Sequence, residues 1–194
     1  MIEQVKLGIA SVAKSFTIDM WLARHTSETV LPRLHKVITS IKEEYADSLS
    51  SGGGLYAAGY CFGAKYVLLL AGDMHKDVMQ GQRTPEAQAE EGMVKEGPAI
   101  KCGAIAHGTS ILKEDMAGVK VPMSIVAVEQ DSLFPDEVRE AGKKTLEEKS
   151  VEHEVEVFSG VPHGFAVLGD YDDGHIVEAQ KRAFTQMLGW LRAH

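Results

Sequence analysis

The sequence has little cysteine and no excess of positive charge. Two cysteines in 194 residues cannot build a disulfide framework, which favours a reducing compartment, and we expect a cytoplasmic protein. The net charge of −8 argues against binding to nucleic acid or to an anionic membrane surface. With 44% hydrophobic and 25% charged residues, the composition is that of an ordinary globular protein, and we expect one domain over residues 1–194.

Long hydrophobic runs and common cofactor motifs are missing as well. No apolar stretch reaches the roughly 18 residues that a membrane-spanning helix needs. The N-terminus lacks the apolar core and the small-residue cleavage site of a secretory signal. The sequence contains no Gly-x-Gly-x-x-Gly or Walker-type loop, and its His, Cys and Asp residues do not have metal-ligand spacing. We therefore expect neither a cofactor nor a metal.

What the sequence does contain is an alternation of strand and helix patterns. Helices are predicted over residues 29–46, 65–71, 134–150 and 177–192, and strands over 55–60, 99–107, 121–129 and 151–160. The polar residues 75–97 indicate an inserted surface loop. Strands that alternate with helices predict an α/β fold, with a mainly parallel sheet and helices on both faces.

The most informative motif is Gly59-Tyr60-Cys61-Phe62-Gly63, between a predicted strand and a predicted helix. This arrangement is typical of a nucleophile elbow, a strained turn that exposes its central side chain at the carboxyl end of a strand. Small neighbours such as Gly59 and Gly63 let strand and helix pack closely around it. The helix N-terminus would favour a thiolate at Cys61, and the amide of Phe62 would be an oxyanion donor.

The alternative for Cys61 is a small buried thiol beside a tight turn, because free cysteine is among the most buried residues. The strand-turn-helix context favours a nucleophile instead. Cys102 gives the contrast, since it lies within an apolar strand and is expected in the core.

Two further residues complete a Cys-His-Asp triad in the order nucleophile, acid, histidine of the α/β-hydrolases. Asp131 directly follows the third predicted strand, and His163 lies between the last strand and the last helix. His163 would accept the thiol proton, and Asp131 would orient the imidazole. Taken alone, Asp131 could be a helix cap and His163 an ordinary loop residue.

Other residues are weaker candidates. His107, at the end of the second strand, either contacts substrate or caps the strand, and Glu129 is a less favoured alternative acid. Candidate pocket residues are Tyr60, His107, Phe134 and Phe165. The aromatic rings of Tyr60, Phe62, Phe134 and Phe165 suggest an apolar or aromatic substrate. Core packing explains these aromatic rings equally well.

Three segments together resemble the dienelactone hydrolase family, and its fungal members most: GYCFGAKY, EQDSLFP and SGVPHGFAVLGD. The resemblance covers roughly residues 20–194. It implies an α/β-hydrolase fold that cleaves a small ester or lactone through an acyl intermediate on Cys61, with Asp131 and His163 completing the triad and no cofactor.

The family's longer N-terminal segment implies features that residues 1–30 do not match. In the family, that segment supplies the first strands, a second oxyanion amide and a glutamate that pairs with the resting thiol. We therefore expect a sheet that lacks its first strands and whose strand 55–60 has a bare edge. Either residues 1–20 fold back over this edge or the protein forms a homodimer there. The loss of one oxyanion donor commonly lowers rates by about 10²–10³.

Two other functions stay open at this point. A glutamine amidotransferase-like enzyme also uses a cysteine elbow, but its histidine normally belongs to an His-x-Glu pair, whereas His163 precedes Gly164 and Phe165. A non-enzymatic binding or interaction module, derived from a shortened hydrolase, would have an unreactive Cys61.

Overall fold

The structure is a computed structural model, and it describes residues 18, 20–73, 97–167 and 169–194. The elements along the chain are α2 (Ser27–Glu44), α3 (Ala46–Ser50), β1 (Tyr56–Tyr60), α4 (Phe62–Leu70), β2 (Cys102–Ala106), α7 (Lys113–Ala117), β3 (Met123–Val128), α8 (Asp136–Glu148), β4 (His153–Phe158) and α9 (Gly174–Ala193). All four predicted strands form. Apart from Gly97, the predicted loop 75–97 lies outside the described residues.

The four strands form one sheet in the order β1-β2-β3-β4, and every neighbouring pair is parallel. Spatial order therefore follows chain order. Because the strands are parallel, their carboxyl ends meet at one edge of the sheet, where the loops after successive strands come together. This edge collects Cys61 after β1, His107 after β2 and Asp131 after β3.

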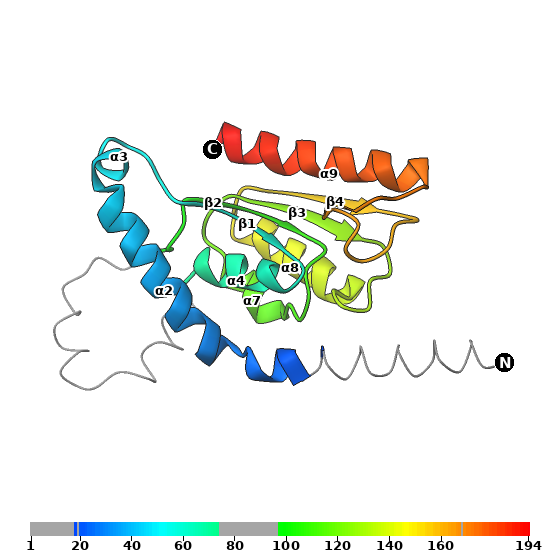
Figure 1. Cartoon of the computed structure of the whole chain (residues 1–194), viewed down its shortest axis with the longest axis horizontal. Coiled ribbons are helices and arrows are strands. Elements are labelled where there is room, and N and C mark those ends of the chain that lie inside the picture. The colour runs from blue at the N-terminus through cyan, green and yellow to red at the C-terminus, as the bar shows by residue number, and fades with distance from the viewer. Residues whose placement is uncertain (1–17, 19, 74–96, 168) are drawn as a thin grey trace.

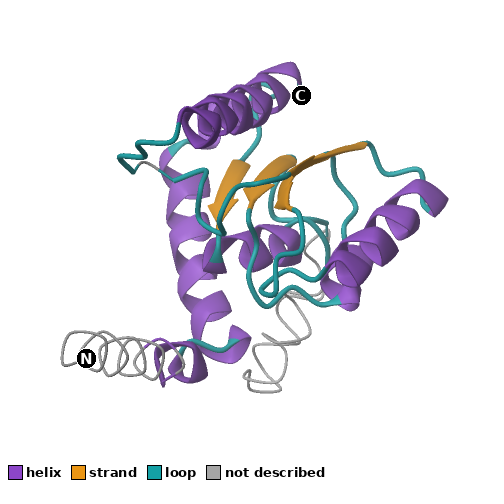
Figure 2. Cartoon of the chain, turned by 90° about the vertical axis from the view of Figure 1, so that its right-hand side faces the viewer, coloured by secondary structure: helices purple, strands orange, loops and turns teal. Residues whose placement is uncertain are grey.

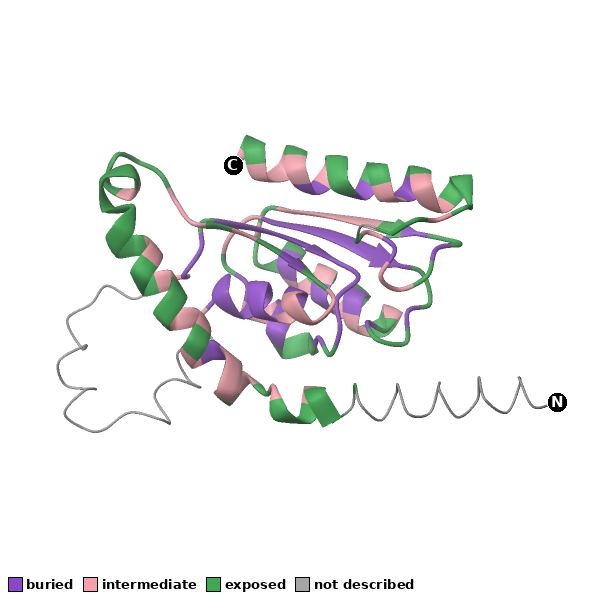
Figure 3. Ribbon diagram, viewed as in Figure 1, coloured by how far each residue is buried: buried purple, intermediate pink, exposed green. Residues whose placement is uncertain are grey.

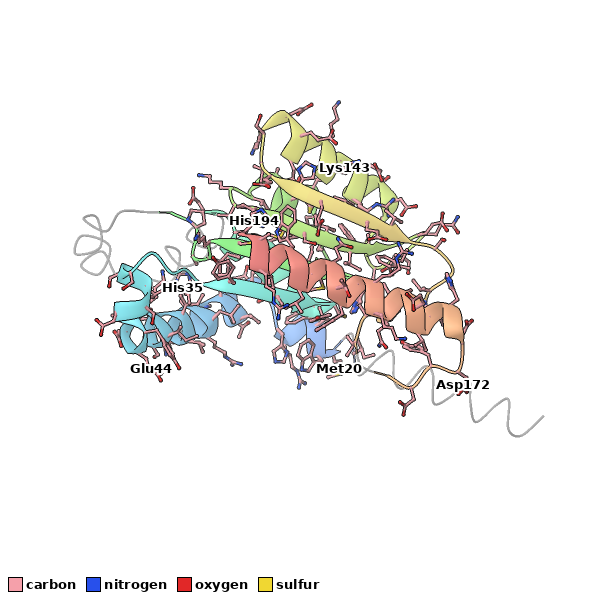
Figure 4. The ribbon with its side chains drawn as sticks, turned by 90° about the horizontal axis from the view of Figure 1, so that it is seen from above. Met20, His35, Glu44, Lys143, Asp172 and His194 are labelled. Atoms are coloured by element: carbon pink, nitrogen blue, oxygen red, sulfur yellow. The ribbon has the colours of Figure 1, made fainter. Side chains whose placement is uncertain are left out.

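Helices cover both faces of the sheet, which confirms the predicted α/β class. Figure 1 shows α9 on one face and α4, α7 and α8 on the other, and the same layers are visible from the side in Figure 2. The α2 helix forms an outer layer against α4, where Leu31 packs on Tyr66 and Leu69. Viewed from above in Figure 4, α9 runs across the sheet to its C-terminal end at His194.

The two central strands carry the core. Every residue of β2 and β3 is buried, because these strands have neighbours on both edges and helices on both faces (Figure 3). One apolar cluster joins the sheet to α4, α7 and α8, and a second joins it to α9. The continuous apolar character of these strand sequences therefore reflects two-sided burial.

The strand β1 is less buried than the two central strands. β1 lies at the edge of the described sheet and pairs with β2 alone, and α9 packs over β2 and β3. Tyr56 and Tyr60 are therefore 40% and 37% exposed. Such an edge has free backbone donors and acceptors on one side among the described residues.

The helices differ from expectation in three places. The helix after the elbow begins at Phe62, not at Lys65, so the turn at Cys61 is tighter than the sequence pattern indicates. The short helix α7 was not predicted. In α9, Ala183 and Met187 are buried, whereas Phe184 is 60% exposed. Within the described ranges, no helix combines the length and apolar character that a membrane span requires.

Candidate active site

Cys61 occupies the turn between β1 and α4. Its φ of 49° lies in the left-handed region that is costly for a residue with a side chain. The Cys61 amide donates to the Ala106 carbonyl at 3.1 Å, which continues the β1–β2 pairing to the turn itself. This is the geometry of a nucleophile elbow, with the thiol at the carboxyl edge of the sheet.

The two elbow glycines have different roles. A Cβ on Gly59 would lie 2.7 Å from the Gly63 carbonyl oxygen and 2.7 Å from Val67 Cγ2, so only glycine fits between strand and helix. A Cβ on Gly63 would meet nothing within 4 Å. The expectation that both positions must be small therefore holds for Gly59 alone.

The first turn of α4 presents its backbone amides beside the thiol. Phe62 is the first residue of this helix, and the first amides of an α-helix have no acceptor within the helix. The amide of Phe62 is thus available beside the position where an oxyanion would form on a carbonyl attacked by Cys61. The positive end of the helix dipole points the same way.

His163 connects the thiol to a carboxylate. Its Nδ1 lies 2.6 Å from Asp131 Oδ2, and its Nε2 lies 3.4 Å from Cys61 Sγ. Asp131 is 7% exposed, and its other oxygen accepts from the Leu133 amide at 2.9 Å. The carboxylate therefore shapes the loop after β3 and contacts His163 at the same time. The three side chains that the sequence singled out lie in one chain of contacts.

Backbone strain is concentrated around these residues. Of the five non-glycine residues with positive φ in the described ranges, Cys61, His107, Ser110 and Gln130 lie at the carboxyl ends of β1 to β3 or in the loops after them. Conformations of this kind cost about 1–3 kcal/mol each and cluster at functional sites. The sheet edge that holds Cys61 and Asp131 is therefore also where strained backbone is concentrated.

His107 is fully buried beside the triad. Its ring lies 5.1 Å from the ring of His163, edge to face, and within the described part neither of its ring nitrogens has a hydrogen-bond partner. Burial, with a further contribution from His163, lowers the pKa of His107 to about 4. His107 is therefore neutral at physiological pH and adds no charge beside His163.

The other candidate pocket residues fall into two groups. Phe134 and Phe165 are 1% and 0% exposed and pack in the two core clusters, so the core explanation that the sequence left open describes both rings. Tyr60 is partly exposed and borders a groove of about 490 Å³ beside α9, which Phe184 also lines.

Thr109 is a site residue that the sequence reasoning missed. Its hydroxyl lies 3.2 Å from Cys61 Sγ and 3.3 Å from His163 Nε2. The signal in the sequence was that Thr109 lies two residues after His107, in the loop after β2, at the same sheet edge as Cys61. Among the residues that the structure covers, no group of three or more His, Cys, Asp or Glu is arranged to hold a metal.

Comparisons with known proteins agree with this architecture. Residues 91–194 match the sequence profile of the Dienelactone hydrolase family, a range that includes Asp131 and His163 and begins after Cys61. "Hydrolase tropI" of Talaromyces stipitatus is 30% identical over 88% of this chain and 56% of its own length. "Hydrolase pyvD" of Aspergillus violaceofuscus is 29% identical over 93% of this chain and 62% of its own length. The chain thus spans about 60% of these curated relatives.

A solved structure, described as a putative dienelactone hydrolase from Klebsiella pneumoniae, shares the fold. The TM-score is 0.54 at 15% sequence identity, over 81% of this chain and 61% of that one. The parallel sheet and its layers therefore match the fold of that structure over part of its length. Since the family profile covers more than half of the sequence, the chain belongs to the dienelactone hydrolase family.

Proposed function

We propose that the protein hydrolyses a small ester or lactone through an acyl intermediate on Cys61. The observation that carries this proposal is the chain of contacts from sulfur to imidazole to carboxylate, with 3.4 Å between Cys61 Sγ and His163 Nε2 and 2.6 Å between His163 Nδ1 and Asp131 Oδ2. Nucleophile and base within reach of each other, with the base oriented by a third group, is the arrangement that activates a thiol.

In the acylation half-reaction, His163 Nε2 takes the thiol proton and Cys61 Sγ attacks the substrate carbonyl carbon. A carbon–sulfur bond forms, and the carbonyl oxygen becomes an oxyanion that accepts from the Phe62 amide. When this intermediate collapses, the carbon–oxygen bond of the ester breaks, and His163 returns the proton to the departing alkoxide. With a lactone the alkoxide stays tethered to the acyl group, so the ring opens without loss of a fragment.

In the deacylation half-reaction, a water molecule gives a proton to His163 Nε2 while its oxygen attacks the thioester carbon. The thiolate of Cys61 then leaves and regains its proton from His163, which releases the acid. Asp131 holds His163 Nδ1 throughout and stabilises the imidazolium that forms twice in the cycle.

The groove beside α9 supports an apolar substrate. It is lined by Tyr60, Ala166, Val167, Gln180, Lys181 and Phe184. Tyr60 joins it to the triad, because its ring lies 5.9 Å from that of His107, which in turn contacts His163. We propose that the apolar part of the substrate occupies this groove.

The test is hydrolysis of p-nitrophenyl acetate by purified variants. Cys61→Ala should reduce the rate to background, because no other nucleophile takes the sulfur's place. Cys102→Ala is the matched control: Cys102 is fully buried in β2, and burial raises the pKa of its thiol, so its removal should leave the rate unchanged. Parent-like hydrolysis by Cys61→Ala would overturn the proposal.

A second candidate is a non-enzymatic interaction module. The observation that favours it is the open side of β1, where exposed Tyr56 and Tyr60 lie on a strand with one neighbour in the described sheet. The two candidates differ in the state of the thiol. A module has no use for an ionised Cys61, whereas a hydrolase requires rapid, pH-dependent labelling of Cys61 by iodoacetamide. Slow labelling at all pH values would favour the module.

A further inference from the structure

The hydroxyl of Thr109 sits at the centre of the proposed reaction without a role in the triad. Its oxygen lies 3.2 Å from Cys61 Sγ and 3.3 Å from His163 Nε2, while those two atoms lie 3.4 Å apart. The three polar atoms therefore form a nearly equilateral triangle. Thr109 is 5% exposed, so water competes little for these contacts.

We propose that Thr109 is a further catalytic residue, whose hydroxyl donates a hydrogen bond to the Cys61 thiolate while it accepts one from the protonated His163. This rests on the proposed function, because it concerns the same thiol. Thr109 touches the reacting sulfur itself. Its role is to stabilise the charged pair that exists once the thiol proton has moved to the imidazole.

The direction of this effect follows from counting protons. A hydroxyl has one proton to donate and two lone pairs that accept. After transfer, sulfur is an anion without a proton and Nε2 carries one, so the hydroxyl can donate to sulfur and accept from Nε2. Both bonds then involve a charged partner, and such bonds are about twice as strong as neutral ones. Before transfer both partners are neutral, so the hydroxyl stabilises the ion pair more than the neutral pair.

The backbone holds this hydroxyl in place before any substrate arrives. The Thr109 amide donates to the Cys61 carbonyl at 3.1 Å, so nucleophile and hydroxyl are tied through their main chains. Lys65, on α4, donates to the Ser110 carbonyl at 3.0 Å and pairs with buried Asp115 at 3.1 Å. The loop after β2 is thereby fastened to the helix that begins at the elbow. A donor fixed in advance needs no reorganisation when charge develops.

A purely structural role makes a different prediction. If Thr109 only fills space and satisfies its own hydroxyl, its replacement changes stability but leaves the ionisation of the thiol where it was. The readout must therefore follow the thiolate and must not depend on ester hydrolysis.

The experiment measures the rate of Cys61 alkylation by iodoacetamide as a function of pH, in a Cys102→Ala background that removes the second thiol. Thr109→Val keeps the shape of the side chain and removes the hydroxyl. We expect it to move the midpoint of the pH profile upward by about one unit, since a hydrogen bond to a charged group is lost. Thr109→Ser, which keeps a hydroxyl, should retain the parent midpoint. Thr109→Ala gives a second test of the same loss if the valine variant does not fold.

Ser110→Ala is the matched control, because Ser110 is the exposed neighbour in the same loop, and it should leave the profile unchanged. Parent-like midpoints for Thr109→Val and Thr109→Ala would overturn the proposal. This failure is distinct from failure of the proposed hydrolysis, which is judged by Cys61→Ala and p-nitrophenyl acetate.

Discussion

At the scale of single residues, the candidate site depends on which groups surround its polar side chains. Asp131 faces His163 with one oxygen and a backbone amide with the other, so each carboxylate oxygen has a hydrogen-bond partner. His107 contributes an uncharged ring beside His163. The proposed base therefore has one carboxylate neighbour and one neutral aromatic neighbour.

Replacement of Asp131 by asparagine should lower kcat for p-nitrophenyl acetate by roughly 10²–10⁴-fold, because an amide can hold the wrong tautomer and cannot stabilise the imidazolium. Glu129→Gln is the matched control, because it makes the same carboxylate-to-amide change at an exposed residue directly after β3, and it should leave kcat unchanged. An unchanged kcat for Asp131→Asn would show that this carboxylate only shapes its loop.

The depressed pKa of His107 makes stability depend on pH. Between the ordinary value of 6.5 and about 4, the unfolded chain binds a proton at this residue and the folded chain does not, so stability falls as pH falls through this window. The two ionisable neighbours of this ring, His163 and Asp131, are present in parent and variant alike. We expect the parent to lose roughly 1–2 kcal/mol more than His107→Asn between pH 7 and pH 5, measured by urea unfolding at both pH values. Equal losses would contradict a buried neutral ring.

At the scale of elements, the elbow is the unit that places the nucleophile. Its strand–turn–helix pattern could be recognised in the sequence because a short apolar run, a glycine-bounded cysteine and a helical segment follow one another. The space around each glycine could not be predicted from the sequence, because it depends on the distance between strand and helix. Gly59 faces the Gly63 carbonyl and Val67, whereas Gly63 faces open space.

The paired substitutions Gly59→Ala and Gly63→Ala test this difference. Gly59→Ala should destabilise the protein by about 1–3 kcal/mol, because its methyl group would overlap backbone atoms. Gly63→Ala should be neutral or stabilising by up to about 1 kcal/mol, since glycine disfavours a helix. Free energies of unfolding in urea decide the matter, and equal destabilisation by both variants would count against a close approach at Gly59 alone.

At the scale of the whole molecule, parallel strands in chain order explain why residues 61, 109, 131 and 163 meet. The α/β class and the four strands could be predicted from local patterns, and so could the three side chains Cys61, Asp131 and His163 that the fold brings into contact. The burial of individual side chains could not be predicted, because it depends on which strands the helices cover. Tyr60 is exposed at the edge of the sheet, whereas Phe134 and Phe165 are buried in the core. Thr109 escaped prediction because its contacts arise only from the folding of one loop. One domain over residues 1–194 stays a prediction.

The open side of β1 leads to a prediction about association. Uncovered parallel edges pair with further strands, so the sedimentation velocity of the protein should show a concentration-dependent dimer. Ala58→Lys introduces a charge on exposed β1 and should shift this equilibrium to monomer. Ala46→Lys adds the same charge at an exposed site in α3 and should not. A parent protein that stays monomeric at all concentrations would contradict association through this edge.

The acyl intermediate on Cys61 can be detected directly by mass spectrometry of the protein quenched during turnover of p-nitrophenyl acetate. Hydrolysis through Cys61 should leave one acetyl group on the Cys61 peptide, which is absent from Cys61→Ala and is lost again on further incubation in water. Turnover without any acetylated Cys61, or acetyl groups confined to surface lysines, would contradict it.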